Sequence, residues 1–567
     1  MNVRQLLDDR LGEAFEQVTK ECAPALVSPA SRPEYGDYQA NGAMAVAKRL
    51  KTNPRKLAED VVGACDLTGI VAEIEIAGPG FINLTLSQEF LKGTLARADL
   101  VTKVPRRESI VIDYSSPNLA KTLHVGHLRS TIIGDATART LEILGHNVWR
   151  QNHIGDWGTP FGMLVTYLDE QGQSSDDLGN LDHFYALASE RFEKDPTFAK
   201  AARKFVVDLQ SGKEGALSRW KQFIKLSTSH MQRIYEQLDI SLNPDHTRGE
   251  SAYNNDLAQV VTDLDKAGLL SLSDGAKCVF LKEFTGKEGK PLPMLVQKSD
   301  GGYLYHTTDL AALRYRHKVL NADRILYFTD GRQNLHFRML FAVAHASEFV
   351  PKSTKLEHHP FGKLLDSNGR PFRSRDGSTI PLDHLVEEAF ERARAIVQSK
   401  NSNLGDREFD EVVRAIAIGA IKYADLSKNR LHDYTFDWDS MLAFEGNTAP
   451  YLQYAFARIQ SLFSRGNLSP KSYRADIVPE NENERNLAIQ LCRFQETLEL
   501  VGREGMPHHL CAYLYELTSR FMRFYETCPV LDAPEKDRKS RLALCARTAK
   551  TLETGLNCLG IAVVTRM

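Results

Sequence analysis

A β-branched run followed by a polar loop and a long helix limits the fold of this chain more than any other feature. The run Ile-Val-Ile at 110–112 is typical of a strand buried on both faces. A polar loop follows at 115–118, and apolar residues then recur at helical spacing from about 125 to 144, where Gly145 ends the pattern. A buried strand, a loop and a helix in this order predict a parallel sheet with crossover helices.

Two further segments extend the predicted sheet. Residues 148–152 and 325–328 indicate buried strands, and the second is again followed by a polar loop and a helical stretch from about His336. Between about 170 and 295, long charged helical segments interrupt this alternation. We therefore expect a Rossmann-type core over 106–383 that carries a connective insertion at about 170–295.

Different patterns flank this core. With 567 residues, the chain is longer than the roughly 250–300 residues at which a single hydrophobic core stops growing. Residues 1–105 predict a separate N-terminal α/β module with a hairpin over 74–86. Residues 384–567 are almost wholly helical in pattern. The expected fold class is α/β: a Rossmann-type parallel-sheet core with a connective insertion, an N-terminal α/β module and a C-terminal all-α helical domain.

Charge and cysteine content narrow the class of protein. A formal charge of -2 and a pI of about 6.8 argue against a broad electrostatic grip on nucleic acid or membrane, so a polyanionic partner must bind at local patches. The eight cysteines contain no C-x-x-C pair, so we expect free thiols and no bound metal. There is no apolar signal core and no apolar run near the roughly 18 residues of a membrane span, so we expect a cytoplasmic protein without membrane contact.

A pair of histidines begins the helix predicted after the first strand. His124 and His127 are three residues apart, so they face one side of a helical turn, and Gly126 between them lets a ligand approach the backbone. Ligands of α/β sheets bind beyond the carboxyl ends of the strands, where this segment lies. We interpret the pair as donors to the phosphate oxygens of a nucleotide. A surface helix start remains the alternative, and zinc is poorly supported because H-x-x-H lacks a third ligand.

Charged side chains surround the predicted pocket. Lys121 lies one turn before His124, where its charge and the helix dipole would together neutralise ATP phosphates, although a lone loop lysine is more often solvated. Asp113 ends the first strand and must face either a cation or water. Tyr305 and Asp309 are four apart, on one face where a helix begins. Two carboxylates and an aromatic ring suit a guanidinium group.

The residues around the histidines also resemble a family signature. Residues 113–135, Asp-Tyr-Ser-Ser-Pro-Asn-Leu-Ala-Lys-Thr-Leu-His-Val-Gly-His-Leu-Arg-Ser-Thr-Ile-Ile-Gly-Asp, are similar to the signature of the arginyl-tRNA synthetases. Supporting matches run along nearly the whole chain, at 36–38, 152–159, 307–309, 331–333, 358–362 and 445–451. The chain thus resembles a class I aminoacyl-tRNA synthetase.

The resemblance implies an arginine–tRNA ligase, which activates L-arginine with ATP to arginyl adenylate and transfers it to the 3′-terminal adenosine of tRNA(Arg). By matching position, arginine would be contacted by Asp113, Asn118, His124, Tyr305, Asp309 and Gln333. ATP would be contacted by Lys121, His124, Gly126, His127, Phe372, Arg373, Ser374 and Arg375, with His124, His127 and Lys121 as the catalytic residues. Mg²⁺ would arrive with the nucleotide. The N-terminal module would contact the tRNA elbow and the helical domain the anticodon, and we expect a monomer.

Aromatic and basic residues alternate in the helical region. The set is Tyr451, Tyr454, Arg458, Phe463 and Arg465. Single-stranded RNA stacks its bases on aromatic rings and binds cations through its phosphates, so Tyr451 and Arg458 are candidate tRNA contacts. Aromatic residues at helical spacing also fill hydrophobic cores, and that alternative stays open. The resemblance adds Met567, since the family's terminal residue approaches the anticodon.

The second class I signature departs from the usual pattern. Lys-Met-Ser-Lys-Ser corresponds here to Pro-Phe-Arg-Ser-Arg at 371–375, which contains no lysine. Many members of the family carry a lysine just before the histidine motif, which is the position of Lys121. We interpret the cation as relocated, because charge that develops on phosphate oxygens needs a positive potential from whichever loop supplies it. Arg373 and Arg375 would assist, or be solvated loop charges.

Two alternatives remain. One is another H-x-G-H nucleotidyl transferase that makes a small-molecule adenylate, against which the roughly 180 helical residues at the C-terminus argue, since such an enzyme needs no anticodon reader. The other is a non-catalytic RNA-binding paralogue, whose sign would be loss of the histidines or the pocket acids. Neither is lost in this sequence.

The relocated lysine gives a direct prediction. Lys121→Ala is expected to cut adenylate formation severely, because positive potential at the ATP phosphates is lost, while tRNA affinity stays nearly unchanged. ATP–pyrophosphate exchange and tRNA filter binding measure the two effects. A variant that activates the amino acid at close to the normal rate would show that the interpretation is wrong.

Overall fold

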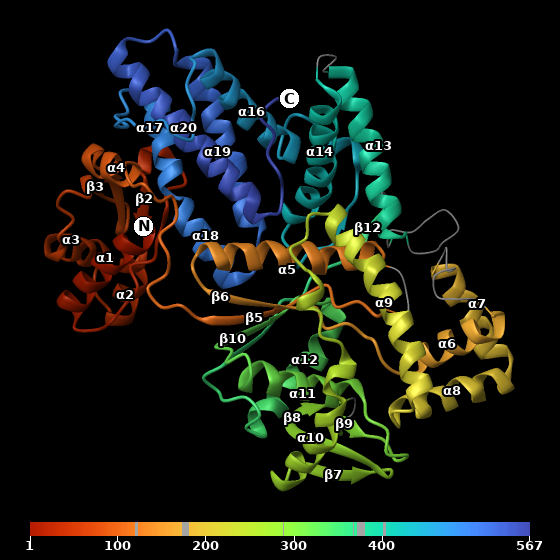
Figure 1. Cartoon of the computed structure of the whole chain (residues 1–567). Helices are drawn as coiled ribbons and strands as arrows, with labels where there is room; N and C mark the ends of the chain where they lie inside the picture. Colours follow the sequence, from red (N-terminus) through yellow and green to blue (C-terminus); the bar gives the residue numbers. More distant parts are fainter. Residues whose placement is uncertain (120–122, 173–180, 287–288, 367, 371–379, 401–403) are drawn as a thin grey trace. The chain divides into compact units, whose positions relative to one another are not determined.

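The chain divides into two compact units (Figure 1). A computed structural model describes residues 1–119, 123–172, 181–286, 289–366, 368–370, 380–400 and 404–567. The first unit comprises Met1–Lys103, Ser399–Ile416 and Leu442–Met567, and the second comprises Val104–Gln398 and Ala417–Met441. The N-terminal module and most of the C-terminal helices therefore share one unit, while the predicted core forms the other.

A four-stranded parallel sheet lies at the centre of the second unit. Its strands, in spatial order, are β11 (Lys355–His358), β10 (Arg324–Tyr327), β5 (Ser109–Asp113) and β6 (Asn147–Gln151). The β-branched run is fully buried, as a central strand covered on both faces requires. The predicted parallel sheet is confirmed.

Crossover helices cover this sheet. Figure 1 shows α5 (Val125–Ile143) along one face, with α11 (Tyr305–Lys318) and α12 (Asn334–Ala346) on the other. Most of α5 is buried, and at Gly134 an added Cβ would lie 2.3 Å from the Cβ of Tyr114. This close approach lets α5 pack directly on the loop after β5, so its N-terminus is fixed at the carboxyl edge of the sheet.

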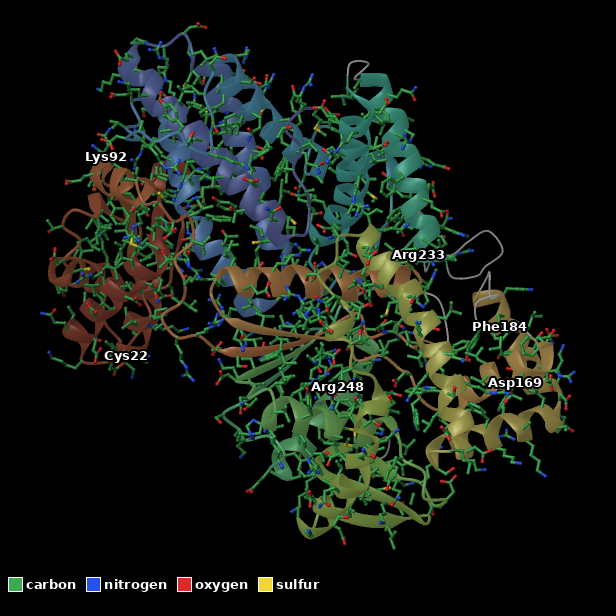
Figure 2. All side chains as sticks on the ribbon, in the orientation of Figure 1. Cys22, Lys92, Asp169, Phe184, Arg233 and Arg248 are labelled. Carbon is green, nitrogen blue, oxygen red and sulfur yellow. The ribbon has the colours of Figure 1, made fainter. Side chains whose placement is uncertain are left out.

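The insertion has a helical part and a β part. The helices are α6 (Thr159–Gln171), α7 (Leu181–Lys194), α8 (Pro196–Gln210), α9 (Glu214–Gln237) and α10 (Asn254–Lys266), with the 3₁₀ turns η3 (Pro244–His246) and η4 (Glu250–Tyr253). The helical part packs through aromatic rings: Phe184, labelled in Figure 2, lies 5.1 Å from Tyr167, and Phe161 lies 6.0 Å from Phe223. Arg219 also pairs with Asp169.

The expectation of helices throughout the insertion is wrong at its C-terminal end. A three-stranded antiparallel sheet stands there, formed by β7 (Leu270–Ser273), β8 (Ala276–Thr285) and β9 (Pro291–Gln297). Val279, Met294 and Val296 are buried in the same hydrophobic core as α10, α11 and α12. Burial of these alternate positions against helices outweighs the helical tendency of the charged residues between them.

The first unit contains the N-terminal module. Its elements are α1 (Val3–Thr19), β1 (Val27–Pro29), η1 (Pro33–Tyr35), β2 (Tyr38–Ala40), α2 (Gly42–Leu50), α3 (Pro54–Ala64), β3 (Val71–Ala77), β4 (Phe81–Leu86) and α4 (Gln88–Leu95). The strands form an antiparallel sheet in the order β1-β2-β4-β3. The predicted hairpin corresponds to β3 and β4 and is confirmed.

The C-terminal region is helical, as predicted. Its helices are α13 (Leu382–Lys400), α14 (Asp406–Leu426), α15 (Trp438–Met441), α16 (Ala449–Arg465), α17 (Glu482–Cys492), α18 (Phe494–Glu504), α19 (His508–Thr527) and α20 (Glu535–Cys558). One small departure is β13 (Tyr434–Thr435), which pairs in parallel with β12 (Leu364–Leu365). Two strands this short give no periodic signal in a sequence.

The Gly-Asp-Tyr motif at 36–38 joins the module to the helices of the first unit. The Asp37 carboxylate accepts hydrogen bonds from the Leu86 amide at 2.7 Å and from Arg485 Nη2 at 2.6 Å. The Tyr38 hydroxyl donates to Glu496 at 3.1 Å. At Gly36, where φ is +77°, an added Cβ would lie 2.7 Å from the Leu84 carbonyl oxygen. The motif is therefore an anchor between two parts of one unit.

Removal of this anchor is expected to destabilise the first unit. Asp37→Ala leaves a buried amide and a largely buried guanidinium without their acceptor, so the free energy of unfolding should fall by about 2 kcal/mol. Chemical denaturation, followed by far-UV circular dichroism, measures the change in the free energy of unfolding. Asp60→Ala, which removes a surface partner of Lys56, is the control and should leave the denaturation midpoint unchanged. Equal midpoints for both variants would contradict the anchoring role.

Candidate active site

The loop that follows β5 has an unusual backbone. Ser115 and Ser116 have φ values of 67° and 45°, a left-handed conformation that costs energy in residues other than glycine. Hydrogen bonds hold the loop in place: the Ser115 amide donates to Ser130 Oγ, the Ser116 amide donates to Asn152 Oδ1, and the His153 amide donates to Ser116 Oγ, at 2.9–3.0 Å. Such over-determined strain is concentrated at functional sites.

Asn118 lies where this loop meets the segment after β6. The Gly155 amide donates to the Pro117 carbonyl and the Leu119 amide donates to the Gly155 carbonyl, both at 3.0 Å. At Gly155 an added Cβ would lie 3.4 Å from the Asn118 Cα. The two polar segments therefore run side by side at the carboxyl edge of the sheet, as expected for a ligand site in this kind of fold.

The two histidines are fixed at the N-terminus of α5. His124 is the N-cap, and its Nδ1 accepts from the Gly126 amide at 3.0 Å. The Nδ1 of His127 accepts from the His124 amide at 3.1 Å, and the ring centroids are 3.9 Å apart. Because each Nδ1 accepts, a neutral ring carries its proton on Nε2. Each ring thus presents an N–H donor where the helix dipole already favours an anion.

Gly126 is required by the position of the first ring. An added Cβ there would lie 2.8 Å from Cε1 of His124. This approach is closer than real Cβ atoms tolerate, so any larger residue displaces the imidazole. The glycine predicted from the motif therefore has a second role, which is to let His124 fold over the helix start.

The segment after the second signature returns to the histidine motif. The Val125 amide donates to the Ile380 carbonyl at 3.1 Å, and the Leu382 amide donates to the Leu123 carbonyl at 2.9 Å. The predicted ATP contacts Lys121, Phe372, Arg373, Ser374 and Arg375 lie outside the described residues. The described residues that follow them, 123–125 and 380–382, meet at the start of α5.

Asp113 faces a cation that belongs to the protein. Its side chain is buried, with Oδ2 2.5 Å from Arg316 Nη2 and Oδ1 accepting from the Ser116 hydroxyl at 2.6 Å. Arg316 is fully buried on α11, and its guanidinium lies 5.0 Å from the ring centroid of Tyr327. The ion pair connects the end of β5 to the helix that carries the other predicted arginine contacts.

Asp309 is the centre of a polar cluster on α11. Its carboxylate lies 2.8 Å from His336 Nε2 and 3.6 Å from His153 Nε2. Burial alone would raise the pKa of Asp309, but the hydrogen bond from His336 and the charges of both histidines outweigh it, and the pKa lies below its usual value. Asp309 therefore stays ionised across the neutral range.

Tyr305 and Gln333 lie on the two segments that hold this cluster. Tyr305 begins α11, is 53% exposed, and lies with its ring centroid 5.1 Å from that of His336. Gln333 ends the 3₁₀ turn η6 (Gly331–Gln333), three residues before His336 on α12. The structure thus brings Tyr305, Asp309 and the Gln333 segment together through His336.

A second carboxylate near Asp309 was not predicted. Glu250 begins η4, and burial, with the charges of Asp309 and Asp156, raises its pKa to about 8. Asp156 fixes this turn, because it accepts from the Ser251 amide at 2.9 Å and from the Ser251 hydroxyl at 2.6 Å. At Gly249 an added Cβ would lie 2.2 Å from Asp156 Oδ2. Glu250 lies in the insertion, and no local motif distinguishes it there.

The candidate RNA contacts lie in the first unit and differ in how far their side chains are buried. The Arg458 guanidinium lies between two rings, 5.3 Å from the centroid of Tyr454 and 4.9 Å from that of Tyr525. Tyr451 is half-buried, 6.1 Å from Tyr515, and Met567 is half-buried too. Phe463 is fully buried, so the core interpretation is correct for that residue.

Other expectations concern cysteines, metals and membranes. All eight cysteines are free, and six of them are buried, which agrees with the expected thiols. Among the described residues, no three His, Cys, Asp or Glu side chains gather in a group that would hold a metal ion. No helix in the described part of the chain has both the length and the apolar character that a membrane crossing needs.

Comparison with known proteins gives a consistent result over the whole chain. The chain matches the models of three families: "Arginyl tRNA synthetase N terminal domain" over residues 1–86, "tRNA synthetases class I (R), catalytic domain" over 91–438, and "DALR anticodon binding domain" over 452–567. It is 49% identical to the arginine–tRNA ligases of Hahella chejuensis and Chromobacterium violaceum, with 100% of each chain covered.

Solved structures agree with these matches. The arginyl-tRNA synthetase of Plasmodium falciparum is similar with a TM-score of 0.86 and 29% identity, over 100% of this chain and 99% of that one. The arginyl-tRNA synthetase of Thermus thermophilus is similar with a TM-score of 0.86 and 25% identity, over 100% of both chains.

Proposed function

The chain belongs to the class I arginyl-tRNA synthetase family, and from that premise we propose how its own residues take part in the reaction. It is an arginine–tRNA ligase, which uses ATP to join L-arginine to tRNA. The observation that carries the residue-level proposal is the cluster at Asp309, where two histidines keep a partly buried carboxylate ionised beside an exposed tyrosine.

This cluster suits the guanidinium group of arginine. Asp309 supplies a fixed negative charge, and Tyr305 supplies an aromatic ring and a hydroxyl. Glu250 supplies a second carboxylate, which ionises when a cation enters. A neutral or shorter side chain would leave these partly buried acids without a cationic partner, so the pocket discriminates by roughly 10⁴-fold without a separate editing site.

The remaining predicted contacts surround this cluster. Gln333 and Asn118 stand at the carboxyl ends of neighbouring strands, β10 and β5, and we assign both to the substrate. Asp113 already contacts Arg316 and Ser116, but each carboxylate oxygen accepts more than one hydrogen bond, so it retains capacity for the α-ammonium group. His124 would contact both substrates, since it begins the helix that follows the loop containing Asn118.

The histidine pair would bind the ATP phosphates. The Nε2–H groups of His124 and His127 act as donors, and the N-terminus of α5 adds its dipole. Lys121, Arg373 and Arg375 would supply the positive charge, and Phe372 and Ser374, their neighbours in the second signature, would contact the nucleotide as well. Class I synthetases use ATP, generally with Mg²⁺; the ion usually binds phosphates and water, so we assign it to the nucleotide.

The reaction would proceed in two steps. The arginine carboxylate attacks the α-phosphorus of ATP and pyrophosphate leaves; the terminal adenosine hydroxyl of the tRNA then attacks the carbonyl of the adenylate and AMP leaves. The protein contributes orientation and charge stabilisation. Consistent with the family resemblance, we propose that the first step requires bound tRNA.

The helical domain would bind the tRNA anticodon. Tyr451 offers a half-exposed ring on which an RNA base would stack, and Arg458 offers a cation for a phosphate. Met567 ends the same unit. We further propose a monomer that acts in the cytoplasm, where translation uses the product.

Amino acid specificity tests the pocket. ATP–pyrophosphate exchange is measured with each amino acid, in the presence and in the absence of total tRNA. Of the amino acids, only arginine should support exchange, and only when tRNA is present. Asp309→Asn should lower kcat/KM for arginine by about 1000-fold, because the guanidinium loses its only permanently ionised partner in the cluster.

Asp274→Asn is a matched control, since it lies in the β7–β8 turn with φ 48°, a conformation that asparagine tolerates. It should retain normal exchange. Exchange with lysine in place of arginine, or an Asp309→Asn variant as active as the control, would overturn the assignment.

Glu250 predicts a pH dependence for arginine binding. Its pKa is raised to about 8, so below that pH the empty pocket holds a neutral acid that must lose a proton when the guanidinium binds. The KM for arginine should therefore fall as pH rises from 6.5 to 8, by at most roughly tenfold per unit, and level off above 8. Steady-state kinetics measure the profile, and calorimetry in two buffers measures proton release.

Glu250→Gln should remove this dependence while Asp309 stays ionised throughout. A variant with the wild-type profile would assign the titration to another group and contradict the role of Glu250.

A further inference from the structure

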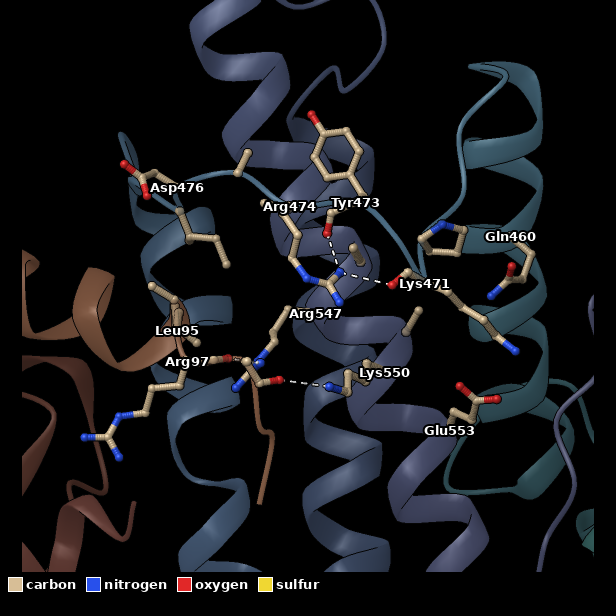
Figure 3. A pocket seen from close by; sticks show the side chains of 18 of the residues that line it. Leu95, Arg97, Gln460, Lys471, Tyr473, Arg474, Asp476, Arg547, Lys550 and Glu553 are labelled. Atoms are coloured by element: carbon tan, nitrogen blue, oxygen red, sulfur yellow. Dashed lines mark hydrogen bonds between the residues drawn. The ribbon is translucent and has the colours of Figure 1, made fainter. Parts of the chain in front are cut away.

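A cavity of about 580 Å³ opens in the first unit, and none of the residues assigned above lines it (Figure 3). Three parts of the chain line it: the end of α4 and the residues after it, the segment 470–477, and the facing sides of α16 and α20. All of these belong to the same compact unit. Its volume lies in the range of roughly 300–1,000 Å³ that is typical of small-molecule sites.

Positive charge dominates the lining. The cationic side chains are Arg97, Lys471, Arg474, Arg547 and Lys550. Of the two acidic side chains, Asp476 is paired at 2.8 Å with Lys92, which does not line the cavity. Glu553 is then the one acid left against five cations, so the cavity has an excess of positive charge.

Backbone carbonyls hold several of these cations without neutralising them. Arg547 Nη1 donates to the Arg97 carbonyl at 2.9 Å, and Lys550 Nζ donates to the Ala98 carbonyl at 3.0 Å. Arg474 Nη1 donates to the carbonyls of Tyr473 and Lys471, at 2.7 and 3.0 Å. Within the described chain, none of the five cations forms an ion pair with a carboxylate.

The cations also act on one another. Burial, and then the charges of Arg547 and Arg474, lower the pKa of Lys550. Burial lowers the pKa of Arg547 too, and Arg474 adds to that effect. Figure 3 shows these three side chains gathered from α20 and the 470–477 segment. An anion placed among them would relieve this repulsion, which is unfavourable while the cavity lacks one.

The floor of the cavity is apolar. Leu95, Phe456 and Ile477 are buried there, and the small residues Ala543 and Ala546 of α20 leave space between helices. The half-buried Tyr473 also lines the cavity, with its ring centroid 5.7 Å from that of Phe463. A bare phosphate would use only the cations, whereas a flat ring attached to a phosphate would use both surfaces.

We propose that this cavity binds a small phosphorylated ligand with a flat apolar part, of the nucleoside phosphate class. The phosphates contact Arg474, Arg547 and Lys550, and the ring lies on the apolar floor beside Phe456. The residues of the aminoacylation site belong to the other unit, so this is a separate ligand site and does not depend on the assignments made above.

A fluorescent ADP tests the proposal. The full chain is first saturated with a non-hydrolysable arginyl adenylate analogue, so that the catalytic site is filled, and N-methylanthraniloyl-ADP binding is then followed by anisotropy. One further site is expected. Arg474→Ala and Arg547→Gln should each weaken it at least about tenfold, because each removes a charged donor to phosphate.

Arg538→Ala is the matched control, since Arg538 lies on α20 but does not line the cavity. It should bind the probe normally. If Arg547→Gln does not fold, Arg474→Ala and Lys471→Ala, on the exposed segment, carry the test. An absence of probe binding, or equal binding in the cavity variants and the control, would overturn the proposal.

The same variants distinguish a nucleic-acid occupant. Filter binding with tRNA should give equal affinity for Arg474→Ala and the wild type. A loss of tRNA affinity without any binding of the fluorescent ADP would assign the cavity to tRNA phosphates and reject the small ligand.

Discussion

The ion pair between Asp113 and Arg316 positions most of the catalytic unit. Both groups are buried, and Arg316 has no exposed surface, so neither charge is tolerable without the other. Asp113 ends β5, immediately before the strained loop that contains Asn118, and Arg316 lies on α11, two turns after Asp309. The pair therefore fixes the two segments that carry the proposed arginine contacts relative to each other.

The start of α5 is held from the opposite direction. Arg129, buried on α5, pairs with Asp425 at 3.1 Å and donates to the His432 carbonyl at 3.0 Å. Its guanidinium also lies 5.1 Å from the Tyr434 ring. Because the helix is buried on nearly all sides, His124 and His127 cannot shift by rotation of α5 as a surface helix would. The donors of the phosphate site are thus pre-organised by packing that lies outside it.

Hydrophobic periodicity and turn residues predicted those helices and strands whose formation depends on residues close in sequence. The Ile-Val-Ile run of β5, the helix at 125–143 and the β3–β4 hairpin follow from periodicity and turn residues. The β7–β9 sheet was missed although Asp274-Gly275 is a strong hairpin signal, because charged residues around it favoured a helical interpretation. Site residues in the signature run were identified, but Arg316 as the partner of Asp113, 203 residues away in sequence, and Glu250 beside Asp309 depend on long-range contacts that no local spacing encodes.

On the proposed assignment, the arginine pocket contains two carboxylates with opposite pKa shifts. Histidines keep Asp309 ionised, whereas burial, with the charges of Asp309 and Asp156, raises the pKa of Glu250 and keeps it protonated near neutral pH. Two fixed negative charges in this pocket would repel each other while it is empty and would have to be held in place by the fold. With one neutral, the resting pocket avoids that repulsion, and the second charge forms only when a guanidinium compensates it. The pocket is therefore selective for a guanidinium without a permanent repulsion between its two acids, since a neutral side chain does not compensate the charge that Glu250 would acquire on ionising.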